Sequence, residues 1–319
     1  MAQKVVIALG GNAILQPKQQ ATYENQLENV RQCCEIIARI VQQGYEVIIT
    51  HGNGPQVGNI LRQQEEAKEL VPPFPLDVCS AESQGFIGYM MDQSLRNELK
   101  KLGLKNTVVS MLTQTEVSLD DPAFLNPVKP IGVFYQEEEA KQLAGQQGWV
   151  VKEDAGRGWR RVVPSPMPKS IIGANSIKSL TDQGTIVIAA GGGGIPVYRQ
   201  TDGTLAGVEA VIDKDRSGYQ MARDVNADVF MILTDVQNVY VNYGKADQKS
   251  LGAISFQEAK RYADEGQFSA GSMGPKMESA ISFAETGGTA IICSLDQADL
   301  ALAGKAGTRI TQENLVHCN

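Results

Sequence analysis

The stretch KVVIALGGN, residues 4–12, decides the fold of this chain. Residues 5–9 are all apolar, and two valines and an isoleucine among them favour a buried β-strand. Gly10, Gly11 and Asn12 follow directly and predict a tight turn at the end of that strand. This unit, a strand that runs into a glycine-rich turn, recurs along the chain and indicates how the chain folds.

The residues downstream repeat this unit. Residues 23–43 carry apolar side chains at a helical period, and Gly44 ends the predicted helix. Residues 45–50 predict a second strand, which runs into a second glycine-rich turn, and a helix from about 56 to 70 follows. Strands that alternate with helices in this way are typical of a parallel sheet covered by helices.

The alternation continues through most of the chain. Further helices are expected at 80–102, 214–225, 256–265 and 276–286, and further strands at 106–112, 185–190, 228–233 and 289–293. We therefore predict an α/β fold with an open, mainly parallel central sheet between helix layers. The whole chain, 1–319, is expected to be one domain with an N-lobe of about 1–175 and a C-lobe of about 176–319.

Residues from about 119 to 170 break the pattern and hold six of the thirteen prolines. Short hydrophobic pieces in this segment indicate a small β-rich or mixed subdomain that protrudes from the sheet. The alternative is a long surface loop, but structureless loops beyond about 15 residues are uncommon in compact domains.

Composition narrows the function. The 319 residues are 42% hydrophobic and 20% charged, so the chain can bury a core. A net charge of −7 disfavours a nucleic-acid binder. No apolar run approaches the ~20 residues of a membrane span, and no signal peptide is recognisable, so we expect a cytoplasmic protein without membrane contact.

Cysteine and histidine are scarce. An odd count of five cysteines without a CxxC pair disfavours a disulfide framework or a structural zinc site, and Cys34 fits the apolar stripe of its helix. The two histidines, His51 and His317, leave little room for hydrolase chemistry. His51 is either a general base or a strand-end histidine bonded to backbone, and the second interpretation is favoured.

Four glycine-rich turns are the main candidates for a binding site. They lie at 10–12, 52–54, 191–194 and 272–276. Backbone N–H groups in such turns can approach an anion closely, so four turns at one sheet edge would favour a phosphorylated or carboxylated ligand. The alternative is plain turn geometry. Neither the GxxxxGK[ST] nor the GxGxxG pattern is present.

Lysines from separate segments supply a second signal. Lys129, Lys214 and Lys276 each lie in or beside a distinctive motif, and phosphoryl transfer needs positive charge on the moving group. The simpler interpretation is that each is a solvated surface lysine. Asp213 and Asp215 flank Lys214 and can orient the lysines or cap a helix.

Other charged residues are assigned lesser roles. Glu209 is interpreted as surface polarity. Arg157, Arg160 and Arg161 surround Trp159 and can brace the protruding segment or draw anions towards the site. A nucleic-acid patch is disfavoured there, because the chain has no second basic cluster.

The motifs together resemble a known family. The set ALGGNAI, HGNGPQVGN, QGFIGY, NPVKPIGVFY, EDAGRGWRRVVPSP, GGGGIPV, EAVIDKD, NYGK and GSMGPK, in this order from Ala8 to Lys276, is similar to carbamate kinases of the amino acid kinase superfamily. The resemblance covers most of the chain. It implies an eight-stranded, mainly parallel sheet with a protruding subdomain, a homodimer, and the reaction ATP + carbamate ⇌ ADP + carbamoyl phosphate.

The resemblance also implies site residues. Gly10, Gly11 and Asn12 would bind the transferred phosphoryl group, and Gly52, Asn53 and Gly54 the carbamate side. Lys214 and Lys276 would neutralise phosphate charge, Asp215 would organise them, and Lys129 would reach over carbamoyl phosphate from the subdomain. The nucleotide would contact residues of the C-lobe: Asp213, Thr234, Asp235, Tyr243 and Met273.

Cofactor and physiology follow from the same resemblance. Mg²⁺ would be held chiefly by the nucleotide phosphates, with no dedicated protein metal site. The reaction would run towards ATP in arginine or related catabolism. Arg216 departs from the family pattern. This departure raises the question of how the residues beside the nucleotide pack. Two alternatives stay open: a relative that phosphorylates another small acid, and a catalytically weak sensor of carbamoyl phosphate or nucleotide.

Overall fold

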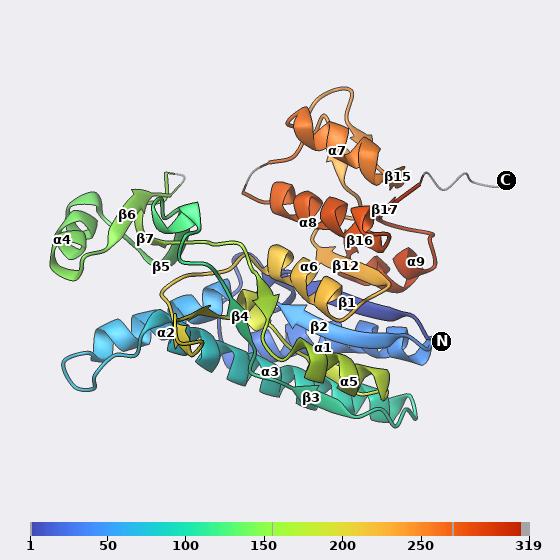
Figure 1. Ribbon diagram of the computed structural model, residues 1–319, viewed down its shortest axis with the longest axis horizontal. Helices are drawn as coiled ribbons and strands as arrows, with labels where there is room; N and C mark the ends of the chain where they lie inside the picture. Colours follow the sequence, from blue (N-terminus) through green and yellow to red (C-terminus); the bar gives the residue numbers. More distant parts are fainter. Residues whose placement is uncertain (1, 155, 270, 314–319) are drawn as a thin grey trace.

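The computed structural model describes residues 2–154, 156–269 and 271–313, so His317 and Cys318 lie outside the described residues. One eight-stranded sheet runs through this part of the chain (Figure 1). Its strands, from one edge to the other, are β15 (Ala253–Ser255), β17 (Thr308–Thr311), β16 (Thr289–Ser294), β12 (Val229–Thr234), β1 (Lys4–Leu9), β2 (Glu46–His51), β9 (Ile186–Ile188) and β3 (Val108–Ser110).

The sheet is mainly parallel, as expected. β1 lies at its centre and pairs in parallel with β2 on one side and β12 on the other. β17 is antiparallel to β16, a reversal that the sequence pattern did not predict. Strands from both halves of the chain meet at β1, and open α/β sheets bind ligands at the carboxyl ends of their strands where the strand order reverses.

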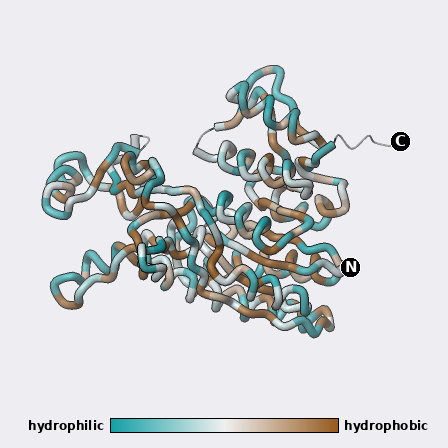
Figure 2. The backbone as a smooth tube through the Cα atoms, in the orientation of Figure 1, coloured by the Kyte–Doolittle hydropathy of each residue, from teal (hydrophilic) through white to brown (hydrophobic). Residues whose placement is uncertain are grey.

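Alternate residues of β1 enter two hydrophobic cores. Val5, Ile7 and Leu9 face one core, while Val6 and Ala8 face the other. The first core is closed by α1 (Tyr23–Gln42), α3 (Leu76–Lys101) and α9 (Ala298–Leu302). The second is closed by α5 (Ala174–Asp182), α6 (Lys214–Asp224), α7 (Phe256–Asp264) and α8 (Met273–Glu285). Figure 2 shows the hydrophobic strands inside these helix layers.

The predicted elements are present with small shifts. The helix expected at 56–70 is α2 (Gly54–Ala67), and the one expected at 80–102 begins earlier, at Leu76 of α3. Lys276 does not open its helix, because α8 begins at Met273 and Lys276 lies in its first turn. Cys34 is fully buried in the first core, as expected. Among the described residues, no helix has the length and apolar character to cross a membrane.

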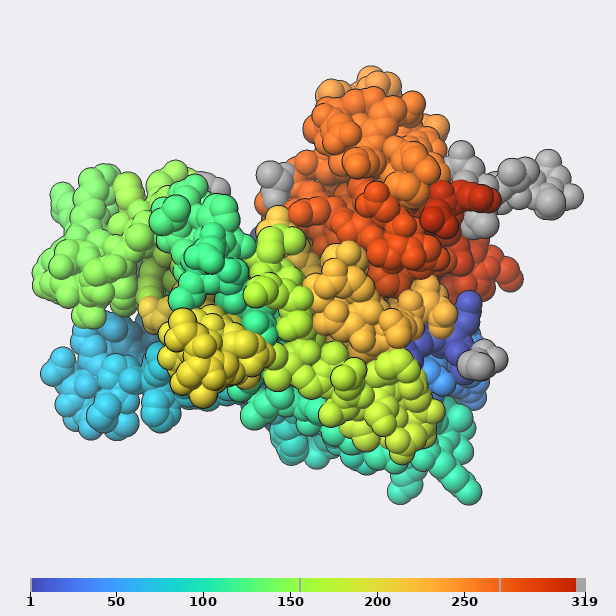
Figure 3. Space-filling view, viewed as in Figure 1, coloured from blue at the N-terminus to red at the C-terminus, as the bar shows by residue number. Residues whose placement is uncertain are grey.

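The segment 119–170 contains a small subdomain and not a long loop. Its elements are β5 (Lys129–Tyr135), α4 (Glu137–Gln147), β6 (Val150–Glu153) and β7 (Trp159–Val163), after a short helix η2 (Pro122–Phe124). The three strands form their own antiparallel sheet in the order β5-β7-β6. Figure 1 shows this subdomain standing away from the central sheet, and Figure 3 shows the surface hollowed between it and the α7–α8 region.

Arginines hold the subdomain together, as one of the two expectations had it. Arg160 donates to Asp154 at 3.1 Å and to the carbonyl of Gly132 at 3.0 Å. Glu209 lies exposed at the surface, as expected, and accepts a hydrogen bond from Arg161 at 2.7 Å.

Smaller elements connect these parts. A four-stranded sheet has the order β11 (Leu205–Gly207), β10 (Ile195–Arg199), β4 (Gln114–Glu116) and β8 (Ser170–Ile171). β13 (Tyr240–Val241) pairs with β14 (Lys249–Ser250). Single turns of 3₁₀ helix are η1 (Gly11–Ala13), η3 (Gly191–Gly193) and η4 (Leu295–Gln297). The limits of the two lobes stay a prediction.

Candidate active site

The first two glycine-rich turns touch each other at the carboxyl end of β1. The Gly10 N–H donates to the carbonyl of Leu233 at 3.0 Å, and the Gly52 N–H donates to the carbonyl of Leu9 at 3.0 Å. A Cβ atom on Gly52 would lie 3.2 Å from the Gly11 nitrogen and 3.3 Å from Lys214 Cδ. A side chain at this position would be tightly packed against both neighbours, so these two turns and Lys214 meet at one point.

The four-glycine turn packs against the end of β2. A Cβ atom on Gly191 would lie 2.4 Å from His51 Nε2, and one on Gly192 would lie 2.1 Å from Asn53 Nδ2. The Gln84 side chain donates to the carbonyl of Gly191 at 2.9 Å and fixes the turn from α3. Three of the four predicted turns therefore converge on one edge of the sheet.

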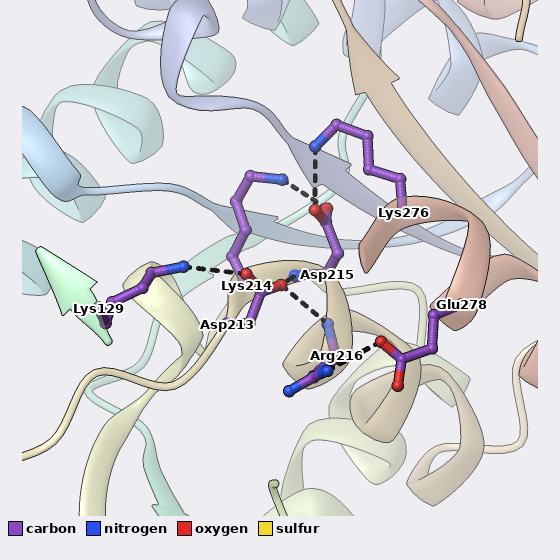
Figure 4. A network of polar contacts seen from close by, with 7 residues as sticks. All are labelled: Lys129, Asp213, Lys214, Asp215, Arg216, Lys276 and Glu278. Atoms are coloured by element: carbon purple, nitrogen blue, oxygen red, sulfur yellow. Dashed lines mark hydrogen bonds and ion pairs between the residues drawn. The ribbon is translucent and has the colours of Figure 1, made fainter. Parts of the chain in front are cut away.

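Lys214, Asp215 and Lys276 form a compact ion cluster at this edge (Figure 4). Lys214 Nζ donates to one oxygen of Asp215 at 2.5 Å, and Lys276 Nζ donates to the other at 2.9 Å. The three side chains are 18%, 4% and 12% exposed, respectively. Lys276 brings the fourth turn to the site, since it lies in the first turn of α8.

The electrostatics of the cluster favour an anionic ligand. Burial lowers the pKa of the Lys214 ammonium, and Lys276 adds to this effect while Asp215 opposes it. α2, α6 and α8 begin at Gly54, Lys214 and Met273, so three helix N-termini contribute partial positive charge at the same edge.

Asp213 joins the subdomain to this cluster. Its side chain caps α6 by accepting from the backbone N–H groups of Asp215 at 2.9 Å and Arg216 at 3.4 Å. The other carboxylate oxygen accepts from Lys129 Nζ at 3.0 Å. Burial acts to raise the pKa of Asp213, but Lys129 and these hydrogen bonds hold it below its ordinary value. Lys129 is thereby held next to the cluster, as Figure 4 shows.

Arg216 has a defined partner. Its guanidinium donates twice to Glu278 of α8, at 3.2 and 2.9 Å (Figure 4). Arg216 thus ties α6 to α8 two residues from Lys276.

The residues predicted for the carbamate side lie between β2 and α3. Asn53 is buried and donates to the Ser83 hydroxyl at 2.8 Å. Gly54 begins α2 directly after it. His51 ends β2, and its Nδ1 lies 2.9 Å from the carbonyl of Gly52, which matches the favoured interpretation of a strand-end histidine. Burial lowers its pKa from 6.5 to about 4, so the ring is neutral at pH 7.

The nucleotide-side candidates are less tightly grouped. Thr234 ends β12 beside Gly10 and donates to Asp235 at 3.0 Å. Met273 packs against the second core at the start of α8. Tyr243 is 73% exposed, and the centre of its ring lies 6.2 Å from the centre of the Tyr240 ring. The structure therefore brings Thr234 towards the turns but leaves Tyr243 outside the ion cluster. Asn12 of η1 is exposed.

Sequence reasoning missed two supporting residues. Gln84 is buried, donates to Thr113 and Gly191, and accepts from the Thr113 N–H at 2.8 Å. Thr115 donates its hydroxyl to Gly193 at 3.0 Å. The available signal was the polar set Ser80, Ser83 and Gln84, whose helical spacing puts polar side chains on a buried face of α3.

Known proteins share this fold and these sequence features. A model of the amino acid kinase family matches residues 3–294. The carbamate kinase of Thermococcus kodakarensis is 56% identical over 315 residues, which cover 98% of this chain and 100% of that protein. The carbamate kinase of Pyrococcus furiosus is 54% identical over 313 residues, which cover 97% and 99%.

A solved structure agrees with the sequence comparison. The carbamate kinase from Giardia lamblia bound to AMP-PNP has a TM-score of 0.93 and 47% identity, over 98% of this chain and 99% of that one. The fold, an open mainly parallel sheet with lysines at its carboxyl edge, and the family match define the class: the chain belongs to the amino acid kinase family. Within that family, its relatives and its structural neighbour confirm the resemblance to the carbamate kinases.

Proposed function

We propose that this chain catalyses the reversible transfer of a phosphoryl group between ATP and carbamate, and that it works towards ATP from carbamoyl phosphate. The observation that carries the proposal is the Lys214–Asp215–Lys276 cluster at the meeting point of the glycine-rich turns. The full-length similarity to carbamate kinases supports the same reaction.

The residues act by position and charge. Carbamate is an anion with a nucleophilic oxygen, so no proton has to be removed from it before it attacks. The buried His51 is therefore not needed as a general base, although its ring is neutral at pH 7. Lys214 and Lys276 stabilise negative charge on the phosphoryl group in flight, and Asp215 holds both ammonium groups in place. The N–H groups of Gly11 and Asn12 bind the phosphoryl oxygens, and that of Asn53 serves the carbamate side. The N–H groups of Gly10 and Gly52 are bonded to Leu233 and Leu9, so these two glycines line the site and hold the turns in place.

The subdomain and the nucleotide side complete the site. Lys129 closes over carbamoyl phosphate from β5. Thr234, Asp235, Tyr243 and Met273 contact the nucleotide, with Asp213 at the junction between the two substrates. AMP-PNP in the Giardia lamblia relative supports nucleotide use here.

Magnesium fits this site as a partner of the nucleotide. Both oxygens of Asp215 already accept from lysines, and the described residues contain no group of three or more metal-ligating side chains. Mg²⁺ bound to the nucleotide phosphates supplies further positive charge for the transfer. We also propose that the chain is a cytoplasmic homodimer and serves arginine or related catabolism.

The test is ATP formation by the purified protein from ADP, Mg²⁺ and carbamoyl phosphate. Acetyl phosphate and buffer alone are the controls. ATP that forms only with carbamoyl phosphate is the expected result. A folded protein that binds nucleotide and forms no ATP would contradict the proposal and favour another small-acid substrate or a sensor.

A further inference from the structure

The protruding subdomain rests on a small apolar joint. Ile131 and Val163, at the base of the subdomain, are buried with residues of α2 and α3, and Val211 packs against the same cluster. The members from α2 and α3 are Val57, Ile60, Leu76 and Cys79. This joint fixes where the subdomain is attached, and its Ile131 lies opposite Arg161 across β5 and β7.

A connecting segment runs along the subdomain from this joint to the ion cluster. Residues 208–213, here called the strap, join β11 to the first residue of α6, which is Lys214. The Val211 N–H donates to the carbonyl of Pro164, just after β7, at 3.0 Å. The strap is bonded to the subdomain at Val211 and continues directly into α6. A movement of the subdomain would therefore also move the start of α6, where Lys214 lies.

Three alternate residues of the strap contact the subdomain. Asp213 pairs with Lys129 at 3.0 Å, Val211 packs at the joint, and Glu209 pairs with Arg161 at 2.7 Å. The strap thus contacts the subdomain at three alternate residues, with an ion pair at each end.

The outer ion pair is positioned on the subdomain side by stacking. The Arg161 guanidinium lies 4.9 Å from the centre of the Trp149 ring, and its side chain is 16% exposed. Both residues line a cavity of about 730 Å³ between the subdomain and α2, with Glu209 at the same cavity. Ile131 and Leu76 of the joint line the same cavity, and the Arg161–Glu209 pair adds a side-chain link between β7 and the strap at its wall.

We propose that Glu209 is a positioning residue: through Arg161 it holds the subdomain against the strap, so that Lys129 stays beside the Lys214–Asp215–Lys276 cluster. The role rests on the proposed function, in which Lys129 contacts carbamoyl phosphate. Glu209 touches neither substrate, and it acts on the carbamoyl phosphate side without altering the nucleotide side.

The kinetic test compares Glu209→Gln, Arg161→Gln and the double variant. Each single change is expected to raise the KM for carbamoyl phosphate by about threefold to fivefold, the size of one partly exposed ion pair, with the KM for ADP unchanged. The double variant should resemble the single ones, because both changes remove the same contact. The charge-reversed pair Glu209→Arg with Arg161→Glu should recover part of the loss.

A matched control separates the ion pair from charge in general. Glu35 of α1 pairs with Arg39 at 3.0 Å on the outer surface, away from the subdomain. Glu35→Gln removes the same charge and should leave both KM values unchanged. Equal effects of Glu35→Gln and Glu209→Gln, or single effects that add in the double variant, would overturn the proposal.

A distance measurement tests the position of the subdomain without any turnover. Spin labels on Gln146→Cys of α4 and Lys260→Cys of α7 report the gap between the subdomain and the C-terminal half, with Cys318 replaced by serine. Four native cysteines are buried, namely Cys33, Cys34, Cys79 and Cys293. Glu209→Gln should broaden the distance distribution and shift it to longer values.

The two readouts distinguish the failure of each proposal. An unchanged distance distribution in Glu209→Gln would overturn the positioning role even if the wild-type protein forms ATP. A changed distribution in a protein that forms no ATP would keep the mechanical role of Glu209 and contradict the proposed function instead.

Discussion

At the scale of single residues, Lys276 is the sharpest test of the cluster. Its ammonium is mostly buried and donates to Asp215, so Lys276→Ala removes one positive charge and frees one carboxylate oxygen. Turnover should fall by at least ~10²-fold, as when one transition-state contact is lost. Initial rates of ATP formation measure this, and thermal melting checks the fold. Lys249→Ala, at an exposed lysine of β14, is the matched control. Near-normal turnover of Lys276→Ala would contradict the role assigned to Lys276.

His51 makes a prediction about stability and pH. Its pKa is lowered from 6.5 to about 4 by burial, so the unfolded chain takes up a proton between these values while the folded chain does not. The contribution to stability is present above pH 6.5 and is lost as the pH falls towards 4. Its size is about 3 kcal/mol. Urea unfolding of wild type and His51→Asn at pH 7 and pH 4 measures the difference. Parallel losses in the two proteins would exclude this role.

At the scale of elements, the turn after β9 depends on space as well as backbone conformation. Gly194 has φ +91°, and a Cβ there would lie 1.9 Å from the Thr115 hydroxyl oxygen. Gly203 has φ +87° but open space around it. Gly194 also has ψ 161°, a backbone region that is essentially confined to glycine. Gly194→Ala should therefore cost about 1–3 kcal/mol more than Gly203→Ala, from this conformation and from overpacking against Thr115 together. Urea unfolding of both variants measures this. Equal losses would show that neither feature constrains the turn.

Elements with a buried face could be predicted from the sequence, and those without one could not. β1 and α1 carry apolar residues at the period of their structure, and both lie where expected. α4 went unnoticed because its sequence, EEEAKQLAGQQ, buries only Ala140. β17 itself was not predicted, because four residues are too few to show a period, and its antiparallel direction depends on its partner β16.

Some residues of the candidate site could be predicted from the sequence, and others could not. Glycine-rich turns and motif lysines are visible in sequence because backbone geometry and charge restrict them to few residue types. The partners of Gln84 and Glu209 are not visible, because each bond joins segments far apart in the chain. Gln84 reaches Gly191, and Glu209 reaches Arg161. Such pairs are set by how the sheet and the subdomain are assembled.

At the scale of the whole molecule, two electric fields of opposite sign act on the substrates. The chain carries a net charge of −7, which repels anionic carbamoyl phosphate and ADP. The site has one positive charge in excess, from Lys129, Lys214 and Lys276 against Asp213 and Asp215, and three helix N-termini add to it. Salt screens charges over about 10 Å at 0.1 M, so ionic strength tells which field governs the approach of substrate.

We expect the local field to govern, because the three lysines lie together at the edge of the sheet where the glycine-rich turns meet, so a substrate bound there is next to them (Figure 4). The kcat/KM for carbamoyl phosphate should then fall with added KCl, while kcat changes little. Lys129 is the most exposed of the three lysines, at 37%, so Lys129→Gln should weaken the salt dependence. Steady-state kinetics over a KCl series measure both effects, with Lys249→Gln as control. A kcat/KM that rises with salt would mean that the net charge of the chain, and not the lysine cluster, determines how substrate arrives.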